Sequence, residues 1–238
     1  MWKPITILTS LARWLLHGTG ILSANLVEAA AWLRSHDDPE MVDKIDDLTS
    51  APREPDLEII TIPGWFSSMG KVQANDLNAD HWSILQIPLR PSSVGTITLA
   101  DSNPFSRPVI HANYFSTEND RQLSIWAFKK CCGIAKGSGV FESWERPKRA
   151  DALRDDEILE YLKESANTCY HPSGTAKIGT ESNNGVVDTN LSMHGIQGLR
   201  VCDVSVMPRI ISGHTCAPII AMAEKFADML KMEYGQIK

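Results

Sequence analysis

The 238-residue sequence lacks the glycine-rich fingerprints that hold nucleotide cofactors. A dinucleotide site has G-x-G-x-x-G between a strand and a helix, with an acidic residue about 20 positions further on. The nearest matches are Gly18-Thr19-Gly20 and Gly137-Ser138-Gly139. Each follows a helical pattern, so each indicates the end of a helix instead. The phosphate loop G-x-x-x-x-G-K-[ST] is missing as well. The sequence therefore shows no recognisable cradle for a pyrophosphate.

The sequence also lacks an excess of positive charge and a metal-binding or redox cysteine motif. The chain carries 23 basic and 29 acidic residues, a net charge of -6. Nucleic-acid binding needs basic patches that displace counterions, so we expect a small-molecule partner and no nucleic acid. The five cysteines include an adjacent pair but no C-x-x-C, which argues against a metal or thioredoxin-type site. Reduced thiols favour a reducing compartment, and we therefore expect a cytoplasmic protein.

Long hydrophobic runs are the third absence. The most apolar segment, Ile5–Leu16, is interrupted by Arg13 and is shorter than the roughly 20 residues that cross a bilayer. No small-residue cleavage site follows it, as a signal peptide would require. We therefore expect no membrane association.

What remains is the composition of a globular protein, 43% hydrophobic and 22% charged. Helical spacing predicts helices from Pro4 to Gly18, from Ser116 or Thr117, over Asp155–Ser165, and from Ala217 to Gly235. Runs rich in Ile, Thr and Leu predict strands at Leu57–Pro63, His81–Leu89 and Gly95–Leu99. The acidic, proline-containing stretch His36–Asp56 reads as an exposed excursion. We predict an α+β fold, mainly an antiparallel sheet flanked by helices.

Two histidines stand in turn-rich segments of the last third. His171 lies in Cys169-Tyr170-His171-Pro172-Ser173-Gly174-Thr175, and His214 in Ser212-Gly213-His214-Thr215-Cys216-Ala217-Pro218. An unperturbed histidine titrates near a pKa of roughly 6.5, so two that share a pocket could divide acid and base roles. A single histidine is more often structural, and we give the remaining ones that role: His17, His36, His81, His111 and His194.

Charged and aromatic side chains supply weaker candidates. Arg90 and Lys177 could contact a substrate, although a solvated surface position is the more common role. Trp65, Trp82 and Trp126 could line an aromatic pocket, but core packing is the more common role for tryptophan.

The two histidine motifs, with Gly185-Val186-Val187-Asp188 and the stretch 193–208 between them, resemble the C-terminal signature of the glucose-methanol-choline (GMC) flavoprotein oxidoreductases. The resemblance implies a substrate-binding domain at 1–170 and a C-terminal segment at 171–238, a remnant of the domain that binds FAD. It makes His171 the base toward a substrate hydroxyl and His214 its partner, with substrate contacts from Tyr170, Ser173, Thr215 and Cys216. Asp203 and Ala217 would lie against a flavin, if one is bound.

In that family the flavin sits on an N-terminal half, which we expect this truncated chain to lack. Our first hypothesis is therefore a cofactor-independent cyclase, lyase or isomerase of secondary metabolism that uses the two histidines as acid and base. The alternative is the substrate half of an FAD-dependent alcohol oxidoreductase that needs a separate flavin-binding half. A third hypothesis is a degenerate relative that binds a ligand without turnover. The uncovered apolar side of the C-terminal segment predicts a homodimer or a local refolding that covers this side.

Overall fold

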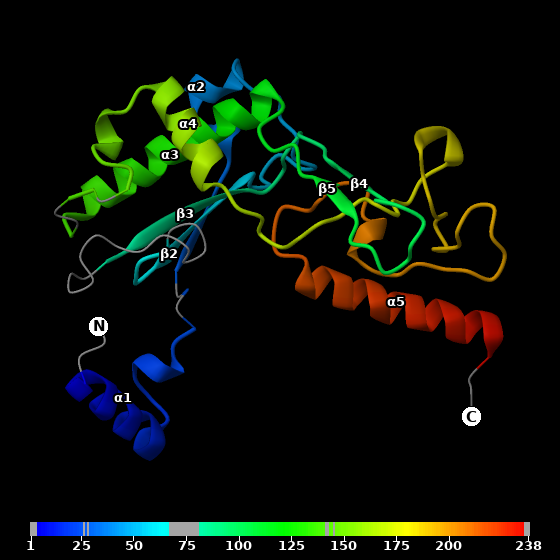
Figure 1. Cartoon of the computed structure of the whole chain (residues 1–238), viewed down its shortest axis with the longest axis horizontal. Coiled ribbons are helices and arrows are strands. Elements are labelled where there is room, and N and C mark those ends of the chain that lie inside the picture. Colours follow the sequence, from blue (N-terminus) through cyan, green and yellow to red (C-terminus); the bar gives the residue numbers. More distant parts are fainter. Residues whose placement is uncertain are drawn as a thin grey trace. The chain divides into compact units, whose positions relative to one another are not determined.

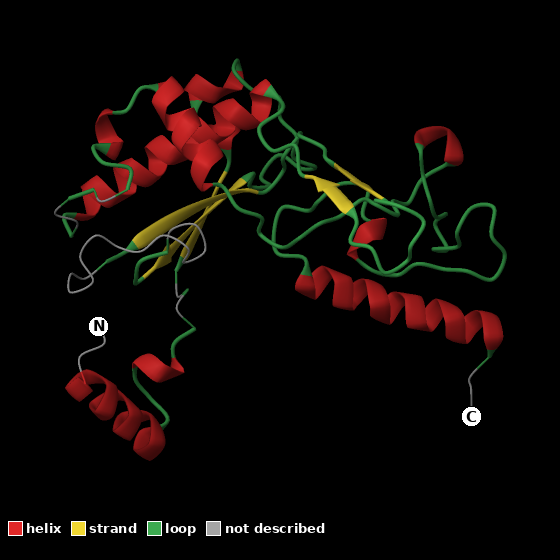
Figure 2. Ribbon diagram, viewed as in Figure 1, coloured by secondary structure: helices red, strands yellow, loops and turns green. Residues whose placement is uncertain are grey.

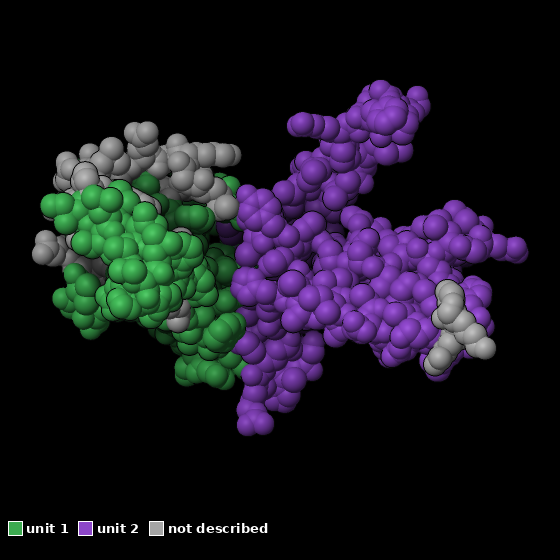
Figure 3. All heavy atoms as spheres, turned by 90° about the horizontal axis from the view of Figure 1, so that it is seen from below, with its two compact units in different colours: residues 1–45, 57–88, 121–167 green, residues 46–56, 89–120, 168–238 purple. Residues whose placement is uncertain are grey.

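The computed structural model describes residues 4–25, 27, 29–66, 81–140, 143–144 and 146–235. Contacts divide the chain into two compact units, which Figure 3 shows in different colours. Unit 1 comprises Met1–Ile45, Leu57–Pro88 and Arg121–Asn167, and unit 2 comprises Asp46–Asp56, Leu89–Asp120 and Thr168–Lys238. The predicted boundary between a substrate-binding domain at 1–170 and a C-terminal segment at 171–238 stays a prediction.

Unit 1 contains a three-stranded antiparallel sheet in the order β1-β2-β3 (Figure 1). The strands are β1 (Ala30–Leu33), β2 (Leu57–Ile62) and β3 (Ser83–Pro88). The register places Ile59 opposite Ala31 on one side and Gln86 on the other. The helices of this unit are α1 (Pro4–His17), α2 (Pro39–Val42), most of α3 (Glu118–Ser138) and α4 (Asp155–Ser165). The combination of helices and antiparallel strands confirms the predicted α+β class (Figure 2).

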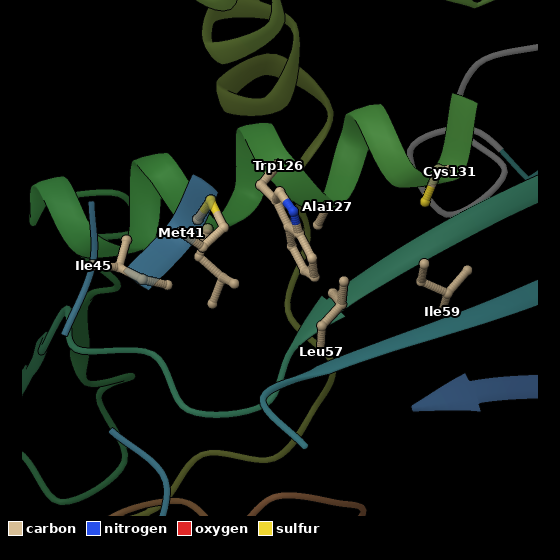
Figure 4. Packing of buried hydrophobic residues seen from close by; sticks show 8 residues of the cluster. Met41, Ile45, Leu57, Ile59, Trp126, Ala127 and Cys131 are labelled. Carbon is tan, nitrogen blue, oxygen red and sulfur yellow. The ribbon is translucent and has the colours of Figure 1, made fainter. Parts of the chain in front are cut away.

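The core of unit 1 lies between α3 and the sheet (Figure 4). Its buried members are Met41, Ile45, Leu57, Ile59, Leu123, Trp126, Ala127 and Cys131. Trp126 belongs to this core, and its indole Nε1 donates a 2.8 Å hydrogen bond to Asp38. Lys130 binds the same carboxylate at 2.8 Å. The tryptophan thus fills the core while its polar edge is satisfied at the rim.

The stretch His36–Asp56 differs from the exposed excursion that its acidity predicts. Asp38 caps α2 by accepting from the backbone N–H of Glu40, and Pro39 occupies the first helical position. Met41 in this short helix and Ile45 in the turn after it are both nearly inaccessible and belong to the core of unit 1. The two apolar side chains therefore anchor this acidic stretch to the core, although most of its charged residues stay at the surface.

Unit 2 contains the hairpin of β4 (Thr96–Thr98) and β5 (Val109–His111). The position just before β4 requires glycine, Gly95, because a Cβ there would lie 2.2 Å from the carbonyl oxygen of His111. A small second core of Val187, Leu191 and Val206 packs against Met222 and Phe226 of the C-terminal helix α5 (Cys216–Tyr234). Across the described residues, no helix is both long and apolar enough to cross a membrane.

Candidate active site

The two histidines singled out by their motifs lie in direct contact within unit 2. His171 Nε2 is 3.0 Å from His214 Nδ1, a hydrogen-bonding distance. The ring centroids are 5.2 Å apart and the planes are inclined at 80°, so the edge of one ring faces the other. His171 is half-buried and His214 is exposed. The fold therefore brings together two imidazole nitrogens from residues that are 43 positions apart in the sequence.

A third side chain extends this contact into a chain of hydrogen bonds. The hydroxyl oxygen Oγ1 of Thr215 lies 3.0 Å from His171 Nδ1. Thr215 is buried and stands at the start of α5, yet its hydroxyl pairs with the imidazole instead of capping the helix. A hydroxyl can donate or accept, so the order of donors from Thr215 through His171 to His214 can reverse. The direction of both hydrogen bonds is therefore set by which nitrogen of each imidazole carries the proton.

The loop that carries His171 is held by backbone pairing with a neighbouring segment. Tyr170 has a φ of 59°, which turns the chain sharply just before the histidine, and Gly174 follows with a φ of 87°. The N–H of Ala176 then donates to the carbonyl of Ser205, and that of Ile178 donates to Val206. A non-glycine residue in the left-handed region is strained and is held there by its surroundings, which places Tyr170 among the residues that shape the site.

The turn that carries His214 is held by Arg90. The guanidinium donates through Nη1 to the carbonyl of Ile210 at 3.1 Å and through Nε to the carbonyl of Leu48 at 3.1 Å. Its Nη2 reaches the hydroxyl of Ser50 at 2.9 Å, and Glu54 lies 3.6 Å from Nη1. Only 12% of the Arg90 side chain is exposed, so Arg90 is a positioning residue and is not a solvated substrate contact.

The other predicted site residues lie around the histidine pair with differing exposure. Tyr170 and Cys216 are exposed, Ser173 is half-buried, and Ala217 is exposed in the first turn of α5. Asp203 is exposed, and its Oδ1 accepts from the backbone N–H of Ser205 at 2.8 Å. The roles of these residues and of the two histidines stay predictions.

Cys169 is a neighbour of the pair that the sequence analysis missed. One ligand atom each from Cys169, His171 and His214 lie within 4.8 Å of one another, although we expected no metal site. The sequence gives no signal for it, because the left-handed turn at Tyr170, between Cys169 and His171, is seen only in the folded chain.

Comparison with known proteins identifies the family. The model of the GMC oxidoreductase family matches residues 91–223. The chain belongs to this family. A dehydrogenase of Strobilurus tenacellus, str4, is 29% identical over 96% of this chain and 41% of its own length. An oxygen-dependent choline dehydrogenase of Brucella anthropi is 32% identical over 95% of this chain and 40% of its own length.

Solved structures agree with the family assignment. Formate oxidase of Aspergillus oryzae matches with a TM-score of 0.80 and 25% identity, over 98% of this chain and 42% of the oxidase. A fungal aryl-alcohol oxidase matches with a TM-score of 0.61 and 30% identity, over 76% of this chain and 28% of that chain. The chain thus spans about two fifths of the length of the curated relatives that it matches.

The expectation of an enzyme without a cofactor is wrong. The chain is a member of an oxidoreductase family, and its relatives are oxidases and dehydrogenases. The formate oxidase structure concerns a modification of its FAD, so the comparisons point to FAD. The reason for the error is physical: the glycine-rich cradle that a sequence search looks for binds the pyrophosphate, whereas groups around the flavin ring leave no such fingerprint.

Proposed function

We propose that this chain is the substrate-binding and C-terminal part of an FAD-dependent GMC oxidoreductase that oxidises a small organic alcohol. A flavin-binding half, supplied by further sequence or by a second chain, completes the enzyme. The observation that carries the proposal is the 3.0 Å contact between His171 and His214 in a chain of this family. The activities of its relatives, which include a choline dehydrogenase and an aryl-alcohol oxidase, support the class of substrate.

The residues beside the histidine pair fit a flavin ring. Because the Thr215 hydroxyl binds His171, the first amides of α5, at Cys216 and Ala217, are left to an outside acceptor such as a ring carbonyl. Ala217 contributes only a methyl group there, which allows a flat ring to approach. Asp203 can offer its second carboxylate oxygen to a hydroxyl of the cofactor. When bound, FAD supplies an acceptor for two electrons.

The histidine pair handles the proton of the substrate hydroxyl. The two facing nitrogens are 3.0 Å apart, so an alcohol oxygen that lies beside the pair can reach both and take the place of the hydrogen bond between them. One imidazole accepts the hydroxyl proton while the other donates a hydrogen bond to the same oxygen. Thr215 holds the ring of His171 in orientation during this transfer and allows its hydrogen-bond order to reverse.

The exposed apolar surface of α5 supports the need for a second half. Over its 19 residues none is buried, and Ile220 and Met232 are 57% and 79% exposed. Apolar surface of this kind is usually covered by a partner. We propose that the flavin-binding half covers it, and the homodimer expected from the sequence stays a prediction.

The test is a purification of the tagged protein from its own organism, together with any flavin-binding chain that accompanies it. We expect a yellow flavin spectrum that is bleached anaerobically by at least one small alcohol. Replacing a general base slows proton transfer by roughly 10²- to 10⁴-fold, so His171→Ala should slow the bleaching by that factor.

The matched control is His111→Ala, because His111 is exposed on β5 and lies outside the histidine pair. This variant should bleach at the rate of the wild type. A colourless wild-type preparation would contradict the redox proposal, and unchanged bleaching in His171→Ala would contradict the role of His171.

A further inference from the structure

We infer that Cys169, His171 and His214 form a binding site for a thiophilic transition-metal ion, with Zn²⁺ as the representative. The thiol sulfur and one nitrogen of each ring lie within 4.8 Å of one another. Cys169 and His214 are exposed, so an ion can enter from solvent without opening the fold. This inference goes beyond the proposed oxidation of an alcohol.

The donor set is one that zinc prefers. Thiolate and imidazole are the usual zinc ligands, and a site with three protein ligands keeps a fourth position for water. Oxygen-seeking ions such as Mg²⁺ and Ca²⁺ would find no carboxylate among the three side chains. The chemistry therefore selects a softer ion.

The distances are close to those of a tetrahedral site. Zinc bonds of roughly 2.0–2.1 Å to nitrogen and 2.3 Å to sulfur place two nitrogens roughly 3.3 Å apart and nitrogen and sulfur roughly 3.6 Å apart. The two ring nitrogens are already 3.0 Å apart, so they need to open by only a few tenths of an ångström. The sulfur has to approach by at most about 1.2 Å, which rotation of an exposed side chain can supply.

A supporting group already stands behind one of the ligands. Metal-bound histidines almost always donate their second ring N–H to an oxygen, which orients the ring and fixes the lone pair on the binding nitrogen. The hydroxyl oxygen of Thr215 lies 3.0 Å from His171 Nδ1, the nitrogen opposite the one that would bind the ion. His171 therefore has the second hydrogen bond that a zinc ligand needs.

Occupation of this site would switch off the acid-base pair. An ion on His171 Nε2 and His214 Nδ1 takes the lone pairs that would otherwise accept a proton. Zinc should then act as a reversible inhibitor that a chelator removes. Binding itself requires neither flavin nor substrate, so it can be measured independently of the redox reaction.

The experiment is a calorimetric titration of the chelator-treated protein with zinc chloride. We expect one ion per chain, and Co²⁺ in its place should show the absorption of a thiolate-to-cobalt charge transfer. Cys169→Ser should remove that absorption and weaken zinc binding at least about tenfold, since a soft ligand is replaced by a hard one. Because Cys169 is exposed, the variant should keep the circular dichroism spectrum of the wild type.

The matched control is Cys216→Ser. Cys216 is a second exposed thiol of unit 2, and its sulfur is not part of the cluster. This variant should keep the cobalt absorption and the zinc affinity. Failure of the wild type to bind zinc, wild-type affinity in Cys169→Ser, or equal loss in both variants would overturn the inference. None of these results would bear on the flavin spectrum or its bleaching, which test the proposed function.

Discussion

Replacing Thr215 by valine removes one hydroxyl from the hydrogen-bonded chain and leaves the volume of this buried side chain nearly unchanged. The lost bond joins Thr215 Oγ1 to His171 Nδ1 over 3.0 Å. A bond of this kind contributes about 0.5–1.5 kcal/mol net, equivalent to a factor of about two to about twelve. Without it, the state in which the ring of His171 has turned away from His214 should gain population by that factor.

The assay is nitrogen NMR of the metal-free protein with labelled histidine, which reports the hydrogen bonding of each ring nitrogen. Thr215→Val should shift and broaden the signals of His171 and, through the 3.0 Å contact, those of His214. Thr215→Ser is the matched control, because it keeps the hydroxyl and loses only a methyl group. Signals of the valine variant that superimpose on those of the wild type would refute a chain of three coupled groups.

Two further predictions concern stability and its dependence on pH. Asp120 accepts from the backbone N–H groups of Ser92 and Ser93 and from the Ser92 hydroxyl. Burial raises the pKa of Asp120, but the hydrogen bonds from Ser93 and Ser92 outweigh it and lower the pKa. Asp120→Asn turns an amide toward a buried N–H group, which should lower the free energy of unfolding by about 1–3 kcal/mol at neutral pH. Urea unfolding measures this change, and a denaturation midpoint equal to that of the wild type would contradict the prediction. The hydrogen bond from Lys130, followed by that from Trp126, lowers the pKa of Asp38 from 3.8 to about 2. A lowered carboxyl pKa stabilises the fold above the unfolded value, and this contribution is lost as the pH falls through the folded value. Thermal melts from pH 4 to pH 2 should therefore decline less steeply for Asp38→Asn than for the wild type, and parallel curves would show that the carboxylate contributes nothing.

Most regular elements could be predicted because their signals are local. The capping pattern at Thr117 and Asp120 predicts a helix that begins near Ser116 or Thr117. The helix α3 begins at Glu118, and the Asp120 N–H donates to the Thr117 hydroxyl at 3.3 Å. The strand β1 was missed, because Ala30–Leu33 is too short and too rich in alanine to stand out. It exists because β2 supplies an antiparallel partner for its backbone groups.

The candidate site divides in the same way. The motifs around His171 and His214 identify both rings from sequence, since their turn residues are recognisable as short patterns. The thiol of Cys169 and the anchoring role of Arg90 could not be identified, because both depend on loops that meet only in the folded chain.

The amino-acid order by itself determined the α+β class, the family resemblance and the two histidines, because periodicity, caps and turn motifs act over a few neighbouring residues. Tertiary structure alone decided that the two imidazoles share a 3.0 Å contact, that Thr215 turns its hydroxyl to a ring, and that a thiol joins them. These contacts join the segments around residues 170 and 214. Hydrogen-bonding distance between such segments is reached only when backbone pairing and packing hold both loops in place.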